Sequence, residues 1–289
     1  MVHSIDAVHR CATKAQASEN VTWWRLSASY TTLRHVVWLH VPKSGSGFAN
    51  LLFRGACSAE AAHPFLEPVE VTCIVRMYCP DAFRAFDWGH APLQQPLLPS
   101  TMAVTLVRTP WRRALSGFFA NMHSCQWLQA NANMTDHRPL PATAPFYSTY
   151  RPAYLRAYAT CISGCATRML TGHICGGGQR AVAGEAKLAP QALATLRKFA
   201  FVGVTDEWNR SLHAFRRAFA VPIRESDSAI RRRGARPKVP GTYERAEATF
   251  RAMRFTDEPL YVEALRILTE IERGTWPPSD IRQHEGSYA

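Results

Sequence analysis

The chain has 289 residues, of which 47% are hydrophobic and 19% are charged, and this composition excludes a disordered chain and predicts a single folded core. Its 34 Lys and Arg against 22 Asp and Glu leave a net charge of +12, which favours an anionic partner without choosing among nucleotides, acidic glycans, nucleic acids and lipid headgroups. No run of 18 or more apolar residues is present, so the sequence as given predicts no membrane-spanning helix, and the first 34 residues lack the apolar stretch of a secretory signal.

The first half of the chain predicts buried strands followed by turns and helices. Residues 1–34 predict an N-terminal extension that packs on a single domain spanning 35–289. The apolar run 36–41 is typical of a buried strand, and a glycine-containing turn leads from it into a helical pattern. Two further apolar runs, 71–78 and 102–107, also predict strands. The second of them is followed by a helix that begins at Pro110 and carries its apolar face on Trp111, Leu115, Phe118 and Phe119.

The second half continues the alternation after a long proline-containing loop. The pattern predicts, in order, a loop at 126–150, a helix at 154–169, a flexible loop at Gly176–Gly178, a helix at about 188–198, a strand at 199–204 and a helix from Asp206 to Ala220. Helices that alternate with fully apolar strands predict an α/β sandwich with a mainly parallel central sheet. No internal repeat is visible.

The turn after the first strand has the chemistry of an anion-binding site. It reads Pro42, Lys43, Ser44, Gly45, Ser46, Gly47 and Phe48. Backbone N–H groups at a strand-to-helix turn can converge on a phosphate where glycine allows the close approach, and the helix dipole adds attraction. The order G-x-x-x-x-G-K-[ST] of a Walker loop is absent, because the lysine here precedes the glycines.

A second set of anion-binding residues follows the strand at 102–107. Arg108 comes at the carboxyl end of that strand, where ligands bind in open α/β sheets, and its planar guanidinium suits a phosphate. Ser116, on the next helix, can add a hydroxyl. An ion pair at the strand end, for Arg108, and a bond to its own backbone, for Ser116, are the structural alternatives.

These two stretches together resemble the nucleotide motifs of the sulfotransferases. H-V-P-K-S-G-S-G is similar to the family's phosphosulfate-binding loop, and L-V-R-T-P-W-R-R-A-L-S-G-F-F is similar to its 3'-phosphate motif, R-D-P-x-x-R-x-x-S. The form of both motifs, together with F-V-G-V-T-D-E-W at 201–208, resembles the carbohydrate sulfotransferases of the heparan 2-O and chondroitin type. The resemblance runs from about Val36 to Phe219 and implies a P-loop-like three-layer sandwich.

The resemblance implies a donor and the residues that hold it. The donor would be 3'-phosphoadenosine 5'-phosphosulfate, with no metal, and Lys43 and the turn from Pro42 to Phe48 would surround its 5'-phosphosulfate. Arg108 and Ser116 would hold the 3'-phosphate, joined by Arg113, which matches the second arginine of the motif. The chain departs from the family in having Thr109 where aspartate is usual and Gly47 where the carbohydrate enzymes often have threonine or serine.

Transfer to a hydroxyl also requires a base and charge neutralisation on the leaving phosphate. Lys43 is expected to neutralise that charge. His90, in D-W-G-H-A-P, lies between the two nucleotide motifs and resembles the base-bearing segment of the heparan 2-O enzymes, although Trp88 stands where those enzymes often have a first histidine. Glu67, Glu70 and Asp87 are the alternatives to His90 as base. Arg112 and the run Arg231, Arg232, Arg233 are weaker candidates for nucleotide contacts.

The acceptor and the location stay open. The resemblance implies a hydroxyl-bearing acceptor that is a glycan, which could be anionic, rather than a nucleic acid. It also implies location in the Golgi lumen with a membrane anchor. The sequence as given shows no such anchor, so a soluble intracellular compartment is the alternative. Sequons at Asn20, Asn133 and Asn209 and the eight cysteines suit an oxidising lumen, but the spacing assigns no disulfide and argues against a zinc site. A basic polysaccharide-binding module with a degenerate nucleotide site and a P-loop kinase are the competing functions.

Overall fold

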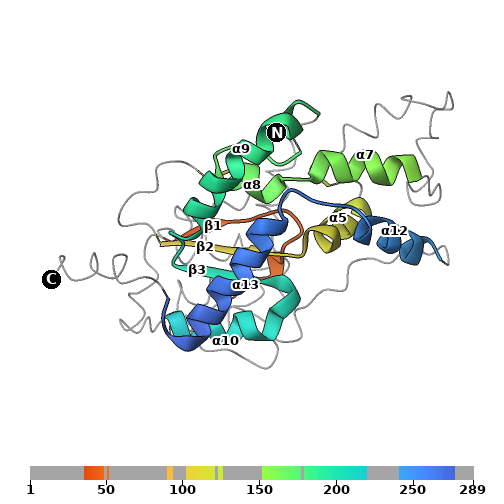
Figure 1. The fold of residues 1–289 in the computed structure, drawn as a ribbon. Helices are drawn as coiled ribbons and strands as arrows, with labels where there is room; N and C mark the ends of the chain where they lie inside the picture. The colour runs from red at the N-terminus through yellow and green to blue at the C-terminus, as the bar shows by residue number, and fades with distance from the viewer. Residues whose placement is uncertain are drawn as a thin grey trace, which may run out of the picture.

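The computed structural model describes residues 36–48, 51, 90–93, 102–120, 123–125, 152–176, 179–219 and 241–276. In these segments three strands form one open sheet with helices packed around it (Figure 1). The predicted extension at 1–34, the strand at 71–78 and the loop at 126–150 lie outside the described residues.

The sheet is parallel, with the order β1-β2-β3. Its strands are β1 (Val36–Leu39), β2 (Met102–Val107) and β3 (Phe201–Val204). β1 pairs with β2 from Val36↔Met102 onwards, and β2 pairs with β3 from Val104↔Phe201 onwards. All four side chains of β3 are buried, as expected for a strand covered on both faces. The prediction of an α/β protein with a parallel sheet is therefore confirmed.

Helices connect and cover the strands. They are α5 (Pro110–Phe118), α7 (Pro152–Ile162), α8 (Cys165–Leu170), α9 (Gln179–Leu196), α10 (Trp208–Phe219), α12 (Thr242–Arg251) and α13 (Glu258–Arg273), with single 3-10 turns η2 (Ser46–Phe48) and η5 (Thr205–Glu207). The helix predicted to begin at Pro110 is confirmed, and Leu115, Phe118 and Phe119 on its predicted apolar face are buried. Trp111 is only half-buried and lies beneath the Arg251 guanidinium, 4.5 Å from it.

Two predicted helices have different boundaries in the structure. The single helix expected over 154–169 is broken between α7 and α8, where Gly164 takes a φ of 69°, a left-handed conformation that suits glycine. The helix expected at about 188–198 begins earlier, at Gln179, and continues through Pro190. The sequence analysis assigned no element to α12 or α13, although α13 contacts both β2 and β3 and crosses the sheet in Figure 1.

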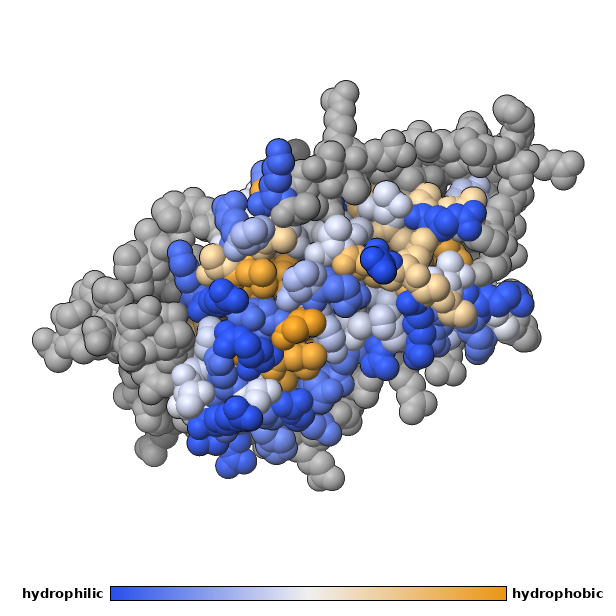
Figure 2. Space-filling model, in the orientation of Figure 1, coloured by the Kyte–Doolittle hydropathy of each residue, from blue (hydrophilic) through white to orange (hydrophobic). Residues whose placement is uncertain are grey.

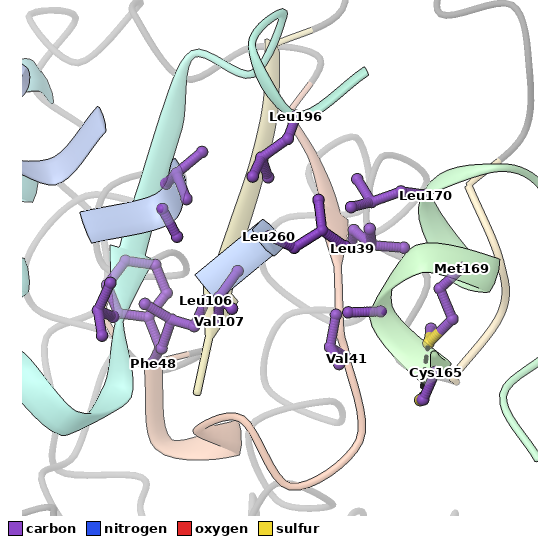
Figure 3. Packing of buried hydrophobic residues seen from close by; sticks show 14 of the residues in the cluster. Leu39, Val41, Phe48, Leu106, Val107, Cys165, Met169, Leu170, Leu196 and Leu260 are labelled. Atoms are coloured by element: carbon purple, nitrogen blue, oxygen red, sulfur yellow. Dashed lines mark hydrogen bonds between the residues drawn. The ribbon is translucent and has the colours of Figure 1, made fainter. Parts of the chain in front are cut away.

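The core extends from the sheet to α10 on one side of the turn after β1 and to α8 on the other. Phe48 stacks on Phe201 with a centroid distance of 5.6 Å and meets Phe215 of α10 edge-on at 4.9 Å. Figure 3 shows Phe48 beside Leu106 at one end of the sheet, and Leu39 and Val41 facing Met169 and Leu170 of α8. The turn between Val41 and Phe48 is thus anchored in the core at both ends.

The surface that carries α13 is mostly hydrophilic (Figure 2). Among the described residues, the large hydrophobic side chains that are exposed are Ile174 and Val262. Within these segments no helix is both long and apolar enough to span a bilayer.

Candidate functional site

The turn after β1 has an unusual backbone conformation. Lys43 takes a φ of 63° and Gly45 a φ of 108°, both in the left-handed region that non-glycine residues rarely adopt. The Ser44 N–H donates to the Val41 carbonyl (3.1 Å) and the Phe48 N–H donates to the Gly45 carbonyl (3.0 Å). Among the described residues, the N–H groups of Gly45, Ser46 and Gly47 donate to no backbone carbonyl. Successive N–H groups left by such a turn form a concave anion-binding site.

Glycine is required at position 45 by packing as well as by conformation. A Cβ at Gly45 would lie 2.9 Å from Leu106 Cδ1 and 3.2 Å from Thr205 Oγ1. Thr205, which follows β3, donates its hydroxyl to the Ser44 carbonyl. The turn is therefore held directly against the carboxyl ends of β2 and β3.

The structure brings together the two motifs that the sequence analysis singled out. Arg108, at the end of β2, donates from Nη1 to the Lys43 carbonyl at 3.1 Å. Burial and the neighbouring Arg108 charge hold the pKa of Lys43 below its ordinary value. Two cations held this close repel each other, so an anion bound between them would be stabilised by both.

The turn that carries Arg108 is stabilised by a carboxylate from η5, the 3-10 turn that follows β3. The N–H and the hydroxyl of Thr109 donate to Asp206 Oδ2 at 2.7 and 2.6 Å, and Arg112 donates to Asp206 Oδ1 at 2.8 Å. Burial by itself raises the pKa of Asp206, but the hydrogen bonds from Thr109 and Arg112 outweigh it and lower the pKa. Asp206 thus provides a carboxylate at the turn where the motif has threonine in place of aspartate. Arg112 is committed to this ion pair.

The second turn of α5 approaches the Lys43 side chain. A Cβ built on Gly117 would lie 3.6 Å from Lys43 Cγ and 2.0 Å from the Tyr158 hydroxyl. The absence of a side chain at Gly117 therefore leaves room for the Tyr158 hydroxyl, and position 117 lies within ordinary contact distance of Lys43. Ser116, next to Gly117, is half-buried on the same helix.

Two residues expected at the nucleotide are engaged elsewhere. Arg113 is 2% exposed and donates to Asp257 Oδ2 (2.7 Å) and to the Ile162 carbonyl (3.0 Å). The Phe48 side chain is fully buried in the aromatic core. α5 turns position 113 toward α7 and α13, so Arg113 lies in the core, as does the Phe48 side chain. Nucleotide binding by either residue stays a prediction. Pro42, also expected at the ligand, is buried.

His90 contacts the backbone just before the turn, and its segment, residues 90–93, is also bonded to α8. Its Nδ1 is 3.1 Å from the His40 carbonyl oxygen, and the Leu93 N–H donates to the Met169 carbonyl at 2.8 Å. A carbonyl oxygen can only accept, so this contact places the proton on Nδ1 and leaves Nε2 as the nitrogen with the lone pair. That tautomer is the one a general base at Nε2 requires.

His123 belongs to the same cluster and was not singled out in the sequence. Its ring centroid is 4.7 Å from that of His90, and the His90 centroid is 4.5 Å from that of His40. Burial, with the nearby His90 and Lys43, lowers the pKa of His123 to about 4, so its ring is neutral near pH 7. Nothing in the local pattern around position 123 distinguishes it from a helix-end histidine, because its neighbours come from distant parts of the chain.

Two disulfides lie in this part of the molecule, one between the segment after His123 and α7, and one between α8 and the residues that follow it. They join Cys125 to Cys161 and Cys165 to Cys175, a pairing that the spacing did not assign. Of the loop expected to be flexible at 176–178, the structure describes Gly176, which is packed closely, since a Cβ there would lie 1.9 Å from the Ser124 carbonyl oxygen. The helix between these cysteines, α8, is capped by Asp257, which accepts from the N–H of Thr167 at 3.0 Å.

The remaining candidates lie outside the described residues: Glu67, Glu70, Asp87 and Arg231 to Arg233. Within the described segments no group of three or more His, Cys, Asp or Glu side chains is arranged to hold a metal ion. Comparison of the chain with protein-family models, with curated proteins and with solved structures gives no match.

Proposed function

We propose that this chain is a sulfotransferase that moves the sulfuryl group of 3'-phosphoadenosine 5'-phosphosulfate to a hydroxyl group on a carbohydrate. The observation that carries the proposal is the 3.1 Å hydrogen bond from Arg108 to the Lys43 carbonyl, because it joins the two turns that resemble the nucleotide motifs of that family. Both turns lie at the carboxyl ends of neighbouring parallel strands, the edge at which α/β sheets bind ligands. On the same grounds we propose that the sheet is the centre of a P-loop-like three-layer sandwich.

The chain's own groups suit the two anionic ends of such a donor. The N–H groups of Gly45 to Gly47, which donate to no described backbone carbonyl, would bind the 5'-phosphosulfate together with the Lys43 ammonium. Arg108 and Ser116 would hold the 3'-phosphate. Ser44 is 2% exposed, and its hydroxyl has no hydrogen-bond partner in the described part of the chain, which also fits an anion at this turn. When bound, the donor supplies an activated sulfuryl group.

His90 is the proposed general base. Its Nε2, with the lone pair that the His40 carbonyl contact leaves there, would take the proton from the acceptor hydroxyl as the oxygen bonds to sulfur. The bond from sulfur to the 5'-phosphate oxygen breaks in the same displacement. Lys43 would stabilise the negative charge that develops on that oxygen; burial, and then the neighbouring Arg108 charge, lower the pKa of Lys43 in the free protein, and a bound anion would offset both.

The disulfides support an oxidising compartment, and we propose the Golgi lumen. Cys125–Cys161 and Cys165–Cys175 both lie within the described core, and such bridges are rare where thiols are kept reduced. The sequon at Asn209 lies on α10 with the asparagine exposed, while Ser211 is buried and bonded to Val204. A glycan acceptor fits the same compartment.

Calorimetric titration with 3'-phosphoadenosine 5'-phosphate tests the proposal directly. We expect saturable binding to the wild-type chain in the presence of a metal chelator, and binding about 10- to 100-fold weaker in Lys43→Ala and Arg108→Ala, the loss typical of a charge-assisted hydrogen bond. Lys198→Ala and Arg216→Ala are the matched controls and should bind as the wild type does. Lys198 is exposed between α9 and β3, and Arg216 is exposed on α10.

The alternative functions give different results in the same experiment. A polysaccharide-binding module would bind heparin fragments while showing no saturable nucleotide binding. A P-loop kinase would require Mg²⁺ and bind ATP in preference. Either result would overturn the proposal, whereas chelator-resistant nucleotide binding followed by loss of sulfate transfer in His90→Ala would support it.

A further inference from the structure

His123 has a defined place in the site but no role in the mechanism above. Its ring meets the His90 ring edge-on, with centroids 4.7 Å apart and an interplanar angle of 82°. On another side His90 is tilted against His40 at 4.5 Å, and His40 in turn stacks on the buried Trp38 at 4.3 Å. The His90 ring is thus in contact with two aromatic neighbours and bonded to one carbonyl.

Both backbone groups of His123 are hydrogen-bonded to distant or earlier parts of the chain. Its N–H donates to the Gly117 carbonyl at 3.0 Å, and its own carbonyl accepts from the buried Tyr158 hydroxyl at 3.0 Å. Burial raises the pKa of Tyr158, which keeps this hydroxyl a donor. Two residues further on, Cys125 is bridged to Cys161 of α7. These contacts hold the His123 ring against His90.

The His123 ring is neutral near pH 7 and fills space beside His90. Its Nε2 is buried without a hydrogen-bond partner among the described residues, so it is not bonded to His90 through that atom. Lys43 and His90 are the charged and titratable groups that act on it, and both disfavour a proton there. A neutral ring in this place excludes water from one side of His90 without adding a charge to a site that already holds Lys43 and Arg108.

We propose that His123 is a positioning residue for His90: its ring packs edge-on against the His90 imidazole and keeps that imidazole on the His40 carbonyl, with Nε2 unprotonated. The inference rests on the proposed function in so far as His90 is the base of the transfer reaction. The contact itself does not depend on that reaction, so the two can be tested separately.

The direct test is the imidazole ¹⁵N spectrum of His90 in the full chain labelled at histidine, with the signals assigned from His90→Ala. In the wild type and in His123→Phe, which keeps an aromatic ring at this place, we expect His90 to be held as the Nδ1–H tautomer. In His123→Ala we expect signals averaged over both tautomers, because the ring is then free to leave the His40 carbonyl. His213→Ala, an exposed histidine on α10, is the matched control and should leave the His90 signals unchanged.

Kinetics give the second measurement. In His123→Ala the kcat for sulfate transfer should fall about 10-fold, the lower end of the loss seen when the orienting partner of a metal-bound histidine is removed, with the KM for the donor unchanged. His123→Phe should retain a kcat close to that of the wild type. The positioning role is overturned if His90 keeps its tautomer in His123→Ala, or if His123→Phe loses as much kcat as His123→Ala with the tautomer intact, since His123 would then act through its nitrogen atoms. If the wild type neither binds the nucleotide nor transfers sulfate, the proposed function fails, and the ¹⁵N spectrum still decides the positioning role.

Discussion

Arg108 and Arg113 stand close together in the chain, in one motif, yet the fold treats them in opposite ways. Arg108 is half-buried at the end of β2 and donates to the backbone carbonyl of Lys43, whose side chain is itself a cation. Arg113 is 2% exposed and bonded to the Asp257 carboxylate. Arg108 stays at the edge of the sheet beside the Lys43 cation, with the Asp206 carboxylate nearby, whereas Arg113 is neutralised inside the core. Two arginines of one motif therefore lie in different surroundings, because the fold brings different distant residues to each of them.

The largest expected effect is at the buried pair. Arg113→Met leaves the Asp257 carboxylate buried without its cation, and the free energy of unfolding should fall by about 3–5 kcal/mol. Urea unfolding at pH 7 measures this change, with Arg156→Met, exposed on α7, as the control. Adding Asp257→Leu should recover only part of the loss, because Asp257 also caps α8 through Ala166 and Thr167. A loss below about 1 kcal/mol in Arg113→Met would mean that the pair is not the structural contact described above.

Replacing Lys43, at the turn after β1, should change nucleotide affinity without lowering the stability of the fold. The fold lowers the pKa of Lys43, so it disfavours the ammonium form, and this penalty on folding applies at pH values below the lowered pKa and disappears above the ordinary one. Lys43→Met should therefore leave the free energy of unfolding at pH 7 unchanged or raise it, while nucleotide affinity falls about 10- to 100-fold. Urea unfolding and calorimetry on the same sample test both parts. A destabilised Lys43→Met variant would contradict the comparison with Arg113.

The role of Asp206 at the turn that carries Arg108 can be tested by moving the carboxylate from position 206 to position 109. Thr109→Asp places a second carboxylate against Asp206, which now accepts from Thr109 at 2.7 Å, and should lower the free energy of unfolding by about 1–3 kcal/mol. Combining it with Asp206→Thr removes the repulsion and leaves one carboxylate, which can reach Arg112 three positions along α5. The double variant should recover most of the stability and the nucleotide affinity. If Thr109→Asp alone is as stable as the wild type, Asp206 does not act as the carboxylate of this turn.

At pH 7 the smallest expected effect comes from the histidine cluster, which contributes a pH dependence at lower pH. The pKa of His123 is lowered to about 4, so between that pH and the ordinary value of about 6.5 the unfolded chain binds a proton that the folded chain does not. Stability should therefore decline as the pH falls through this range and lose no more from His123 below about 4. His123→Phe should flatten this part of the curve of unfolding free energy against pH, and an unchanged slope would show that His123 does not carry it.

The fold could be predicted from the sequence where local pattern and burial agree. The three confirmed strands are continuous apolar runs, and a helix start at Pro110 follows from the fixed φ of proline. The break at Gly164 was missed because apolar residues continue at helical spacing on both sides of it. α12 and α13 were not predicted, although Leu260, Ala264, Ile267, Leu268 and Ile271 recur at helical spacing along α13, which covers the sheet.

The candidate site also has features that follow from local sequence and features that depend on tertiary contacts. The sequence by itself determined that a lysine and glycines follow β1 and that an arginine follows β2, because strand ends and turn residues are local properties, and parallel pairing then brings such ends to one edge. Only the tertiary structure decided that Asp206 supplies the carboxylate beside Thr109, that Arg113 is neutralised by Asp257, that Cys125 pairs with Cys161, and that His123 meets His90. Each of these contacts joins residues far apart in the chain, and spacing along a sequence carries no information about which distant side chain arrives opposite a charge.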